Sequence, residues 1–503
     1  MFDPVVAELE ATNARLRAII EAQAEKLRVQ EELIAELRSR LDELQAELSR
    51  DSATSSLPPS RDGTDRRARR AAEAKQRREE RRGGMPARKP GKQPGAPGAT
   101  QQRREPTKTV LHEPETCRRC GAHLDAAPVT RRATRQVLEI PAPTLEAVDH
   151  VAVTRRCGCG CETSGAFPPE ATGPVCWGPR ARATGAYLLG RQHLAVQRGA
   201  EAMADLFAAP MGEGTLAGLL PEAAGGLGGF MDTVAGLVVA SPFVHADETS
   251  VRVGVDLAWV HTASTPTLTH LALHERRGID AIADIGVLTN YTGTIVHDGL
   301  ATYDSDKLSK ATHAQCCSHL IRSLKDLARS PSQDPWAHAM IGVLVRARDA
   351  SLEAAAARLG AVPEAVAIPI RERYREILTQ ALVRLPGDVP PPHKHRGGWT
   401  KAERDAWNLA TRMRRHEDQV LRVLQDTRIP FTNNTGERSF RFTKLHDKIS
   451  GTFRNRAHAE AFLAVRSYLG TGAKQGMRAM DLLIRLWTPE GAWLPSVVAT
   501  DTS

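Results

Sequence analysis

The sequence has no run of 18 or more uncharged apolar residues, the length that a membrane-spanning helix needs. Its most apolar stretch, residues 225–242, is rich in glycine and is interrupted by Asp232. The N-terminal segment is acidic and amphipathic, so it also lacks the basic start and apolar core of a secretory signal. These absences exclude a membrane partner and favour a cytoplasmic protein.

Cysteine is scarce, and its distribution argues against a secreted protein held by disulfides. The eight cysteines of the 503-residue chain are clustered, with two Cys-x-Cys steps and the adjacent pair Cys316-Cys317. This pattern is typical of metal ligation or of reduced thiols rather than of a disulfide framework.

Positive charge is in excess and is unevenly placed. The formal net charge is +9, and residues 61–92 carry 13 Lys and Arg against 5 Asp and Glu. Such a block indicates a nucleic-acid partner, and a solubilising linker is the alternative. We expect DNA contacts from four arginines of this block: Arg66, Arg67, Arg69 and Arg70. A chain of this length contains three or four structural units.

Residues 5–49 carry a heptad pattern over six repeats. The first core position holds Val6, Asn13, Ile20, Leu27, Ile34, Leu41 and Leu48, and the second holds Leu9, Leu16, Gln23, Gln30, Leu37 and Leu44. Isoleucine and leucine at these positions, with one asparagine at the first, favour a parallel coiled-coil dimer. The alternative is one amphipathic helix folded onto its own chain. The following residues, 50–108, contain no Phe, Trp or Tyr and cannot bury enough apolar surface to order themselves.

Two cysteine groups predict a zinc-binding module. Cys117 and Cys120 form the first group, and Cys157, Cys159 and Cys161 form the second, with short strands expected at 135–140 and 151–155 between them. Two thiolate pairs at tight turns suit a tetrahedral zinc ion. The second group offers three thiolates for two places, and we expect Cys161 with either Cys157 or Cys159. A redox or unligated cluster is the alternative.

The remainder predicts helices around an α/β core. Residues 180–240 have helical apolar faces, with Thr215 as an expected N-cap, and either form a helix-turn-helix or pack against the core. Strands are then expected at 243–247, 251–255, 257–262 and 267–273, followed by a helix at 278–285, a strand at 294–298 and a short strand near 313–317. Three strands in hairpin order, a helix and a parallel strand are the ribonuclease H-like order. Residues 325–428 are mostly helical and too long for a loop, so they indicate an inserted helical domain.

Three acidic residues suggest a metal-dependent site. Asp247 and Asp298 each end an apolar run, and Glu437 lies on a later helix. Carboxylates brought together in this way can hold two Mg²⁺ or Mn²⁺ ions, which activate a nucleophile and stabilise the leaving oxygen in phosphodiester chemistry. Two alternatives stay open: the aspartates cap turns, or Glu248 or Asp256 replaces Asp247.

Basic and amide side chains surround Glu437 in the sequence. We expect DNA contacts from Arg438, Arg441, Lys444, Lys448 and Arg454, although Arg441 can equally pair with Glu437. Asn433 and Asn434 are expected to cap the helix or to bind the DNA backbone.

Several of these motifs together resemble transposases of the insertion sequence 66 family. The motifs are Pro430-Phe431-Thr432-Asn433-Asn434-Thr435-Gly436-Glu437-Arg438, Lys448-Ile449-Ser450-Gly451-Thr452-Phe453-Arg454, Arg466-Ser467-Tyr468-Leu469-Gly470-Thr471, Lys474-Gln475-Gly476, Asp247-Glu248-Thr249 and His297-Asp298-Gly299. Cys317-Ser318-His319-Leu320-Ile321-Arg322 resembles the family's Cys-x-x-His motif with one residue fewer. Gly436 and Ser439-Phe440 depart from the usual Ala and Asp-Leu.

The resemblance implies a DDE transposase, with Asp247, Asp298 and Glu437 as catalytic ligands of Mg²⁺ or Mn²⁺ and with Zn²⁺ in the cysteine module. Its partners would be double-stranded DNA (terminal inverted repeats and target), a second copy through the coil, and accessory proteins of the element, in the cytoplasm at the nucleoid. A catalytically inactive DNA-binding regulator is the alternative. The expected parts are a coiled coil (1–50), basic linker (51–110), zinc-binding module (111–178), helical segment (179–240), ribonuclease H-like core (241–324 and 429–490), helical insertion (325–428) and tail (491–503).

Overall fold

The computed structural model describes residue 23 and residues 101–330, 332–390 and 398–496. The expected coiled coil lies almost wholly outside the described residues, as do most of the basic linker and its four arginines, so these assignments stay predictions. The chain divides into two compact units, residues 1–138 and 139–503, and each is described by itself. In the described part of the chain, no helix is both long and apolar enough to cross a membrane.

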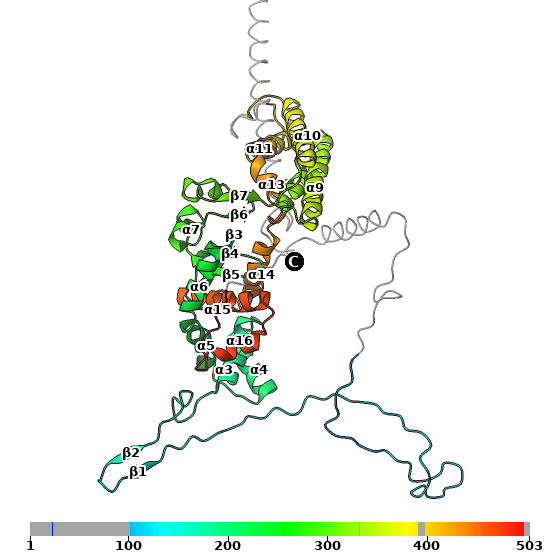
Figure 1. Cartoon of the computed structure of the whole chain (residues 1–503), viewed down its shortest axis with the longest axis vertical. Helices are drawn as coiled ribbons and strands as arrows, with labels where there is room; N and C mark the ends of the chain where they lie inside the picture. The colour runs from blue at the N-terminus through cyan, green and yellow to red at the C-terminus, as the bar shows by residue number, and fades with distance from the viewer. Residues whose placement is uncertain (1–22, 24–100, 331, 391–397, 497–503) are drawn as a thin grey trace, which may run out of the picture. The chain divides into compact units, whose positions relative to one another are not determined.

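A five-stranded mixed sheet lies at the centre of the second unit (Figure 1). Its strands are β3 (Phe243–Val253), β4 (Asp256–Ser264), β5 (Thr269–His274), β6 (Thr294–His297) and β7 (Thr312–Gln315), in the spatial order β5-β4-β3-β6-β7. Strands β3, β4 and β5 pair antiparallel, whereas β6 lies parallel to β3 and β7 lies parallel to β6. The described chain is thus a mixed α/β protein.

The connections between strands follow from local chemistry. A two-residue turn joins β3 to β4, and Gly254 supplies its positive φ of 61°. Parallel strands need longer crossovers. Helix α7 (Ile279–Ile285) lies in the connection from β5 to β6, and two short 3-10 turns, η2 (Ala301–Asp304) and η3 (Asp306–Leu308), lie between β6 and β7.

The expectation that one strand ends at Asp247 and another begins at Val251 is wrong. Strand β3 continues to Val253 because β4 pairs with it from His245 to Val253, with Asp247 opposite Thr262. Asp247 therefore lies in the middle of a strand rather than at its end. Of the strands expected between the cysteine groups, 135–140 does not form. Its apolar side chains Val137 and Ile140 are 86% and 87% exposed and have no surface to bury against.

Helices α3 (Pro179–Gly190), α4 (Val196–Phe207), α5 (Glu213–Gly225) and α6 (Gly228–Val239) precede the sheet. Helix α5 begins at Glu213 with Gly212 in extended conformation as its N-cap, so Thr215 lies inside the helix and is not a cap. Helices α5 and α3 contact the C-terminal helices α15 (Arg456–Lys474) and α16 (Ala479–Arg485). Helices α3 and α5 thus pack against the C-terminal part of the chain.

Helix α15 is buried on most of its surface and closes the β5 edge of the sheet. The backbone N–H of Leu271 donates to Ser467 Oγ, and that of Thr269 donates to Thr471 Oγ1, both at 3.0 Å. A Cβ at Gly470 would lie 3.3 Å from Thr269, so this helix approaches the strand closely. The Arg466–Thr471 motif thus satisfies the hydrogen-bonding groups of an edge strand.

A second group of helices covers the β7 end of the sheet (Figure 1). It comprises α8 (Cys317–Leu327), α9 (Asp334–Ala356), α10 (Glu364–Val383), α11 (Lys401–Arg415), α12 (Glu417–Val420) and α13 (Arg422–Gln425), and α9 to α13 lie within the expected helical insertion. Successive side chains of β6 point to opposite faces of the sheet and enter two different apolar cores. Ile295 packs with the sheet and the N-terminal helices, and Val296 packs with the helical insertion.

Candidate functional site

The register of the parallel strands brings Asp247 and Asp298 together. His245 of β3 pairs with Val296 of β6, and β6 ends at His297 while β3 runs on. Continuing this register by two residues sets Asp247 beside Asp298. The two acidic side chains therefore belong to one edge of the parallel part of the sheet, beyond the last pair that β3 and β6 share.

Electrostatics show that Glu437 belongs to the same neighbourhood. Burial, together with the negative charges of Asp298, Glu248 and Glu437, raises the pKa of Asp247 to about 8, although the N–H donated by Glu248 acts in the opposite direction. Buried carboxylates that repel one another are costly unless a cation or a proton compensates them. The donor set consists of carboxylate oxygens, which Mg²⁺ and Mn²⁺ prefer, so these residues fit such ions.

The two alternatives for this site have different outcomes. The carboxylate of Asp298 does cap a turn, because its Oδ1 accepts the N–H of Leu300 at 2.9 Å, and this bond leaves its second oxygen for other partners. Neither replacement for Asp247 is suitable. Glu248 is buried against Arg277 (3.2 Å) and the Tyr303 hydroxyl (2.9 Å), and Asp256 is exposed at the far end of the β3–β4 hairpin.

Asn433 joins the third carboxylate to the sheet. Helix α14 (Asn434–Ile449) starts directly after it, and its buried side chain contacts His245 Nδ1 at 2.8 Å and donates to Ala246 O at 2.9 Å. Asn433 is the N-cap residue of α14, as expected, but its side chain makes no capping hydrogen bond, because both of its polar groups are used inside the protein. The expected contact of Asn434 with the DNA backbone stays a prediction. A Cβ at Gly436 would lie 2.8 Å from Asn433 Oδ1, so an alanine at this position would require the Asn433 side chain to shift.

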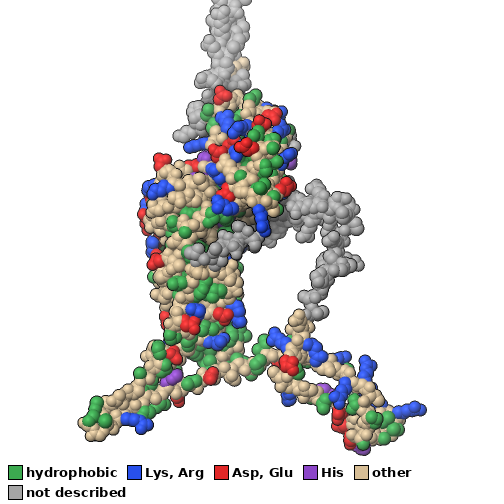
Figure 2. Space-filling model, viewed as in Figure 1, with side chains coloured by type: hydrophobic (Ala, Val, Ile, Leu, Met, Phe, Trp, Pro, Cys, Tyr) green, Lys and Arg blue, Asp and Glu red, His purple; other side chains and the backbone are tan. Residues whose placement is uncertain are grey.

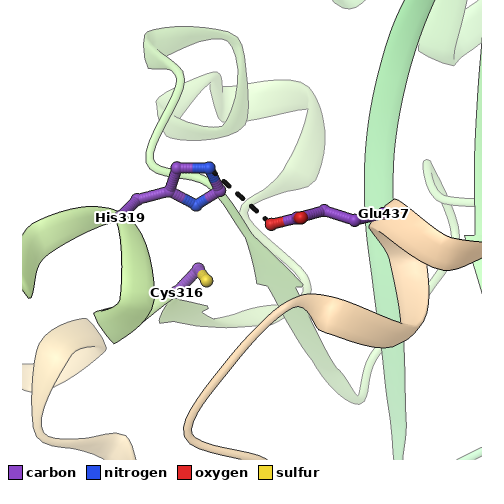
Figure 3. Close-up of side chains that lie close together, drawn as sticks. All are labelled: Cys316, His319 and Glu437. Carbon is purple, nitrogen blue, oxygen red and sulfur yellow. Dashed lines mark ion pairs between the residues drawn. The ribbon is translucent and has the colours of Figure 1, made fainter. Parts of the chain in front are cut away.

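Cys316, His319 and Glu437 form a compact cluster (Figure 3). One ligand atom from each lies within 4.8 Å of the other two, and His319 Nε2 is 3.7 Å from Glu437 Oε1. The Cys-x-x-His motif therefore begins at Cys316 and has its usual length. The assignment of the motif to Cys317 was wrong, because the Cys317 thiol points instead to the backbone carbonyls of Gln315 and Val420.

Arg412 is a residue of this neighbourhood that sequence reasoning missed. It comes from α11 of the helical insertion, and the negative charges of Asp298 and Asp304 favour its charged form, although burial lowers the pKa of its guanidinium overall. An arginine 114 positions beyond Asp298 in the sequence carries no local signal of this role. The insertion thus adds positive charge beside the carboxylates.

The five basic residues expected to contact DNA are all exposed: Arg438, Arg441, Lys444, Lys448 and Arg454. On α14 the spacing of Glu437, Arg441, Lys444 and Lys448 places them on one helical face. Glu437 is paired with His319 rather than with Arg441. Elsewhere the surface is mixed, and Figure 2 shows Lys and Arg interspersed with Asp and Glu over the helices of the insertion.

The two cysteine groups lie in different units, so each is described alone. Cys117 and Cys120 occupy a tight turn closed by the bond from Gly121 N to Cys117 O, and backbone N–H groups of Arg119 and Cys120 lower the pKa of Cys117. Cys157, Cys159 and Cys161 form the loop between β1 (Thr154–Arg156) and β2 (Glu162–Ser164). Hydrogen bonds from Cys159 lower the pKa of the Cys157 thiol, whereas Cys161 Sγ lies 3.8 Å from Glu162 O. The expected zinc pair, Cys161 with either Cys157 or Cys159, stays a prediction.

Comparison with known families identifies the class. The model described as "Transposase IS66 family" matches residues 174–461, more than half of the chain, and identifies it as a transposase. More narrowly, the chain belongs to the IS66 family. Residues 3–101 match a family of unknown function (DUF6444). A search of curated proteins found no match.

Proposed function

We propose that this transposase cuts and joins DNA by DDE chemistry, with Asp247, Asp298 and Glu437 holding two Mg²⁺ or Mn²⁺ ions in a ribonuclease H-like core. The observation that carries the proposal is the β3–β6 register, which sets Asp247 beside Asp298 at one edge of the sheet. The strand order β5-β4-β3-β6-β7, with three antiparallel and two parallel strands, supports the ribonuclease H-like assignment. Membership of a transposase family supports DNA as the substrate.

Bound divalent cations would lower the pKa of an attacking hydroxyl or water and offset charge on the scissile phosphate. The protein's own residues hold the carboxylates in place. The N–H of Glu248 fixes one oxygen of Asp247, and the N–H of Leu300 fixes one oxygen of Asp298. Glu437 lies one turn after Asn433, with its N–H donating to Asn433 O at 3.1 Å.

The exposed basic face of α14 would bind the DNA backbone next to this site. Arg441, Lys444 and Lys448 follow Glu437 along the helix at spacings of four, three and four residues, so phosphates bound there lie near the third carboxylate. Arg412 would add charge from the insertion. Binding through phosphate contacts weakens steeply with salt. We further propose that the coil pairs copies of the chain and that the cysteine groups bind zinc.

The test is metal-dependent nicking of a duplex that carries the terminal sequences flanking the gene. We expect Asp298→Asn to abolish nicking and strand transfer while DNA binding stays within about twofold, because catalysis depends on the cations whereas affinity comes mainly from phosphate contacts. Asp256→Asn removes an exposed carboxylate at the turn of the β3–β4 hairpin and is the matched control. Nicking by Asp298→Asn at the wild-type rate would refute the assignment. Absence of nicking by the wild type, with DNA binding intact, would favour the inactive regulator.

A further inference from the structure

We propose that Cys316, His319 and Glu437 form a transition-metal site of the zinc class, separate in chemistry from the carboxylate site but sharing Glu437 with it. The cluster combines a thiol, an imidazole and a carboxylate, whereas Mg²⁺ prefers oxygen ligands alone. The DDE assignment gives Cys316 and His319 no role, and the resemblance to a Cys-x-x-His motif does not say what these two side chains bind. The binding part of the proposal does not depend on the proposed function.

The backbone brings the three side chains together from two helix starts. Cys316 is the N-cap of α8, and His319 lies one turn later with its N–H donating to Cys316 O at 3.1 Å. Glu437 is in the first turn of α14. The N-terminus of a helix carries partial positive charge, which stabilises negative charge on Cys316 and Glu437. The N–H of Asn433 points at Cys316 Sγ at 3.0 Å and adds to this effect. Burial and the charge of Glu437 nevertheless raise the pKa of the Cys316 thiol overall, so without a cation the thiol keeps its proton.

The distances leave a gap of the right size for an ion. Zinc binds sulfur at about 2.3 Å and nitrogen or oxygen at about 2.0–2.2 Å, which separates tetrahedral ligands by roughly 3.3–3.8 Å. The observed pair His319 Nε2–Glu437 Oε1, at 3.7 Å, is too long for a hydrogen bond but matches that separation. The other imidazole nitrogen, Nδ1, is buried without a hydrogen-bond partner and lies on the side of the ring that faces Cys316 in Figure 3.

The site also has the accessibility that a metal needs. Cys316 is fully buried, whereas the side chains of His319 and Glu437 are 29% and 24% exposed. An ion would thus have three protein ligands and one position open to water or to a phosphate oxygen, the arrangement of exchangeable rather than structural zinc. The ion would replace the thiol proton of Cys316, so binding releases protons.

Sharing Glu437 has a consequence for activity, and this part does rest on the proposed function. An ion held by Cys316 and His319 engages the carboxylate that the magnesium site needs. Zinc would therefore inhibit magnesium-dependent nicking, and loss of Cys316 would relieve the inhibition.

Cobalt is the direct probe, because Co²⁺ bound to a thiolate gives a charge-transfer band and visible d–d bands. The full-length chain is titrated as wild type, Cys316→Ser, His319→Ala and Cys317→Ala. The last variant is the matched control, since Cys317 is the buried neighbour whose thiol faces away from the cluster. The cysteine groups at 117–120 and 157–161 contribute equally to all four spectra. Circular dichroism verifies that each variant is folded.

We expect the wild type and Cys317→Ala to bind one more Co²⁺ than Cys316→Ser. His319→Ala should bind this additional ion at least about 100-fold more weakly than the wild type. Substituting a residue that only supports a metal ligand typically weakens metal binding by about 10–100-fold, so a larger loss identifies His319 as a ligand. Identical spectra for the wild type and Cys316→Ser would overturn the proposal and leave His319 only as a residue that orients Glu437. A cobalt difference without any magnesium-dependent nicking by the wild type would retain the metal site and refute the proposed function instead.

Discussion

Replacing Asn433 by alanine should destabilise the protein far more than replacing its neighbour Asn434. The Asn433 side chain is fully buried, contacts His245 Nδ1 at 2.8 Å and donates to Ala246 O at 2.9 Å. Alanine leaves both groups of β3 buried and without that partner, at about 1–3 kcal/mol each. We therefore expect a loss of about 3 kcal/mol, which at roughly 2 °C per kcal/mol lowers the melting temperature by about 6 °C.

Thermal unfolding followed by fluorescence measures this shift. Asn434→Ala is the matched control, because Asn434 is the exposed first residue of α14 and should change the melting temperature by no more than about 1 °C. Equal melting temperatures for the two variants would refute the reasoning that Asn433 joins α14 to the sheet. If Asn433→Ala lost DNA affinity while its stability stayed unchanged, Asn433 would instead be a DNA contact.

Two further variants test packing and burial. Gly472→Ala places a Cβ 2.2 Å from Leu482 Cδ1 and should lower the free energy of unfolding, measured in urea, by about 1–3 kcal/mol. The control is Gly218→Ala, on an exposed face with no atom within 4 Å, which should be neutral or stabilising. Equal effects of the two substitutions would contradict the close packing of α15 and α16. Burial lowers the pKa of His446 to about 4, below the unfolded value of about 6.5, so the unfolded chain takes up the proton first and stability falls as pH drops from about 6.5 toward about 4. His446→Phe should reduce the loss between pH 7.5 and pH 5 by about 2 kcal/mol, and an unchanged pH dependence of the urea midpoint would refute this.

Sequence patterns gave the order of elements well and their ends less well. The hairpin order, the later parallel strand and the helical insertion are all visible in periodicity, which each segment carries within itself. The end of β3 is not, because its continuation past Asp247 depends on the partner strand β4. A polar residue within a strand looks like a terminus until the pairing is known.

The candidate site shows the same limit. Apolar runs directed attention to Asp247 and Asp298, and a later helix to Glu437; in the structure the charges of Asp298 and Glu437 both act on Asp247. The contributions of Asn433 and Arg412 could not be predicted, because each depends on contacts with segments more than a hundred residues away. The choice between Cys316 and Cys317 required knowing where β7 ends and α8 begins, a difference of one residue.

The hydroxyls of Ser467 and Thr471 have a bearing on how copies of this protein can meet. They occupy the backbone N–H groups of Leu271 and Thr269 that an incoming strand would need. At the opposite margin, Arg422 Nε donates to His313 O at 3.3 Å, and α12 and α13 pack on β7. These contacts occupy backbone groups at both borders of the sheet, so they disfavour its extension by a strand of a neighbouring molecule. If copies of the chain assemble, we expect helices, loops or the nucleic acid itself to make the contacts.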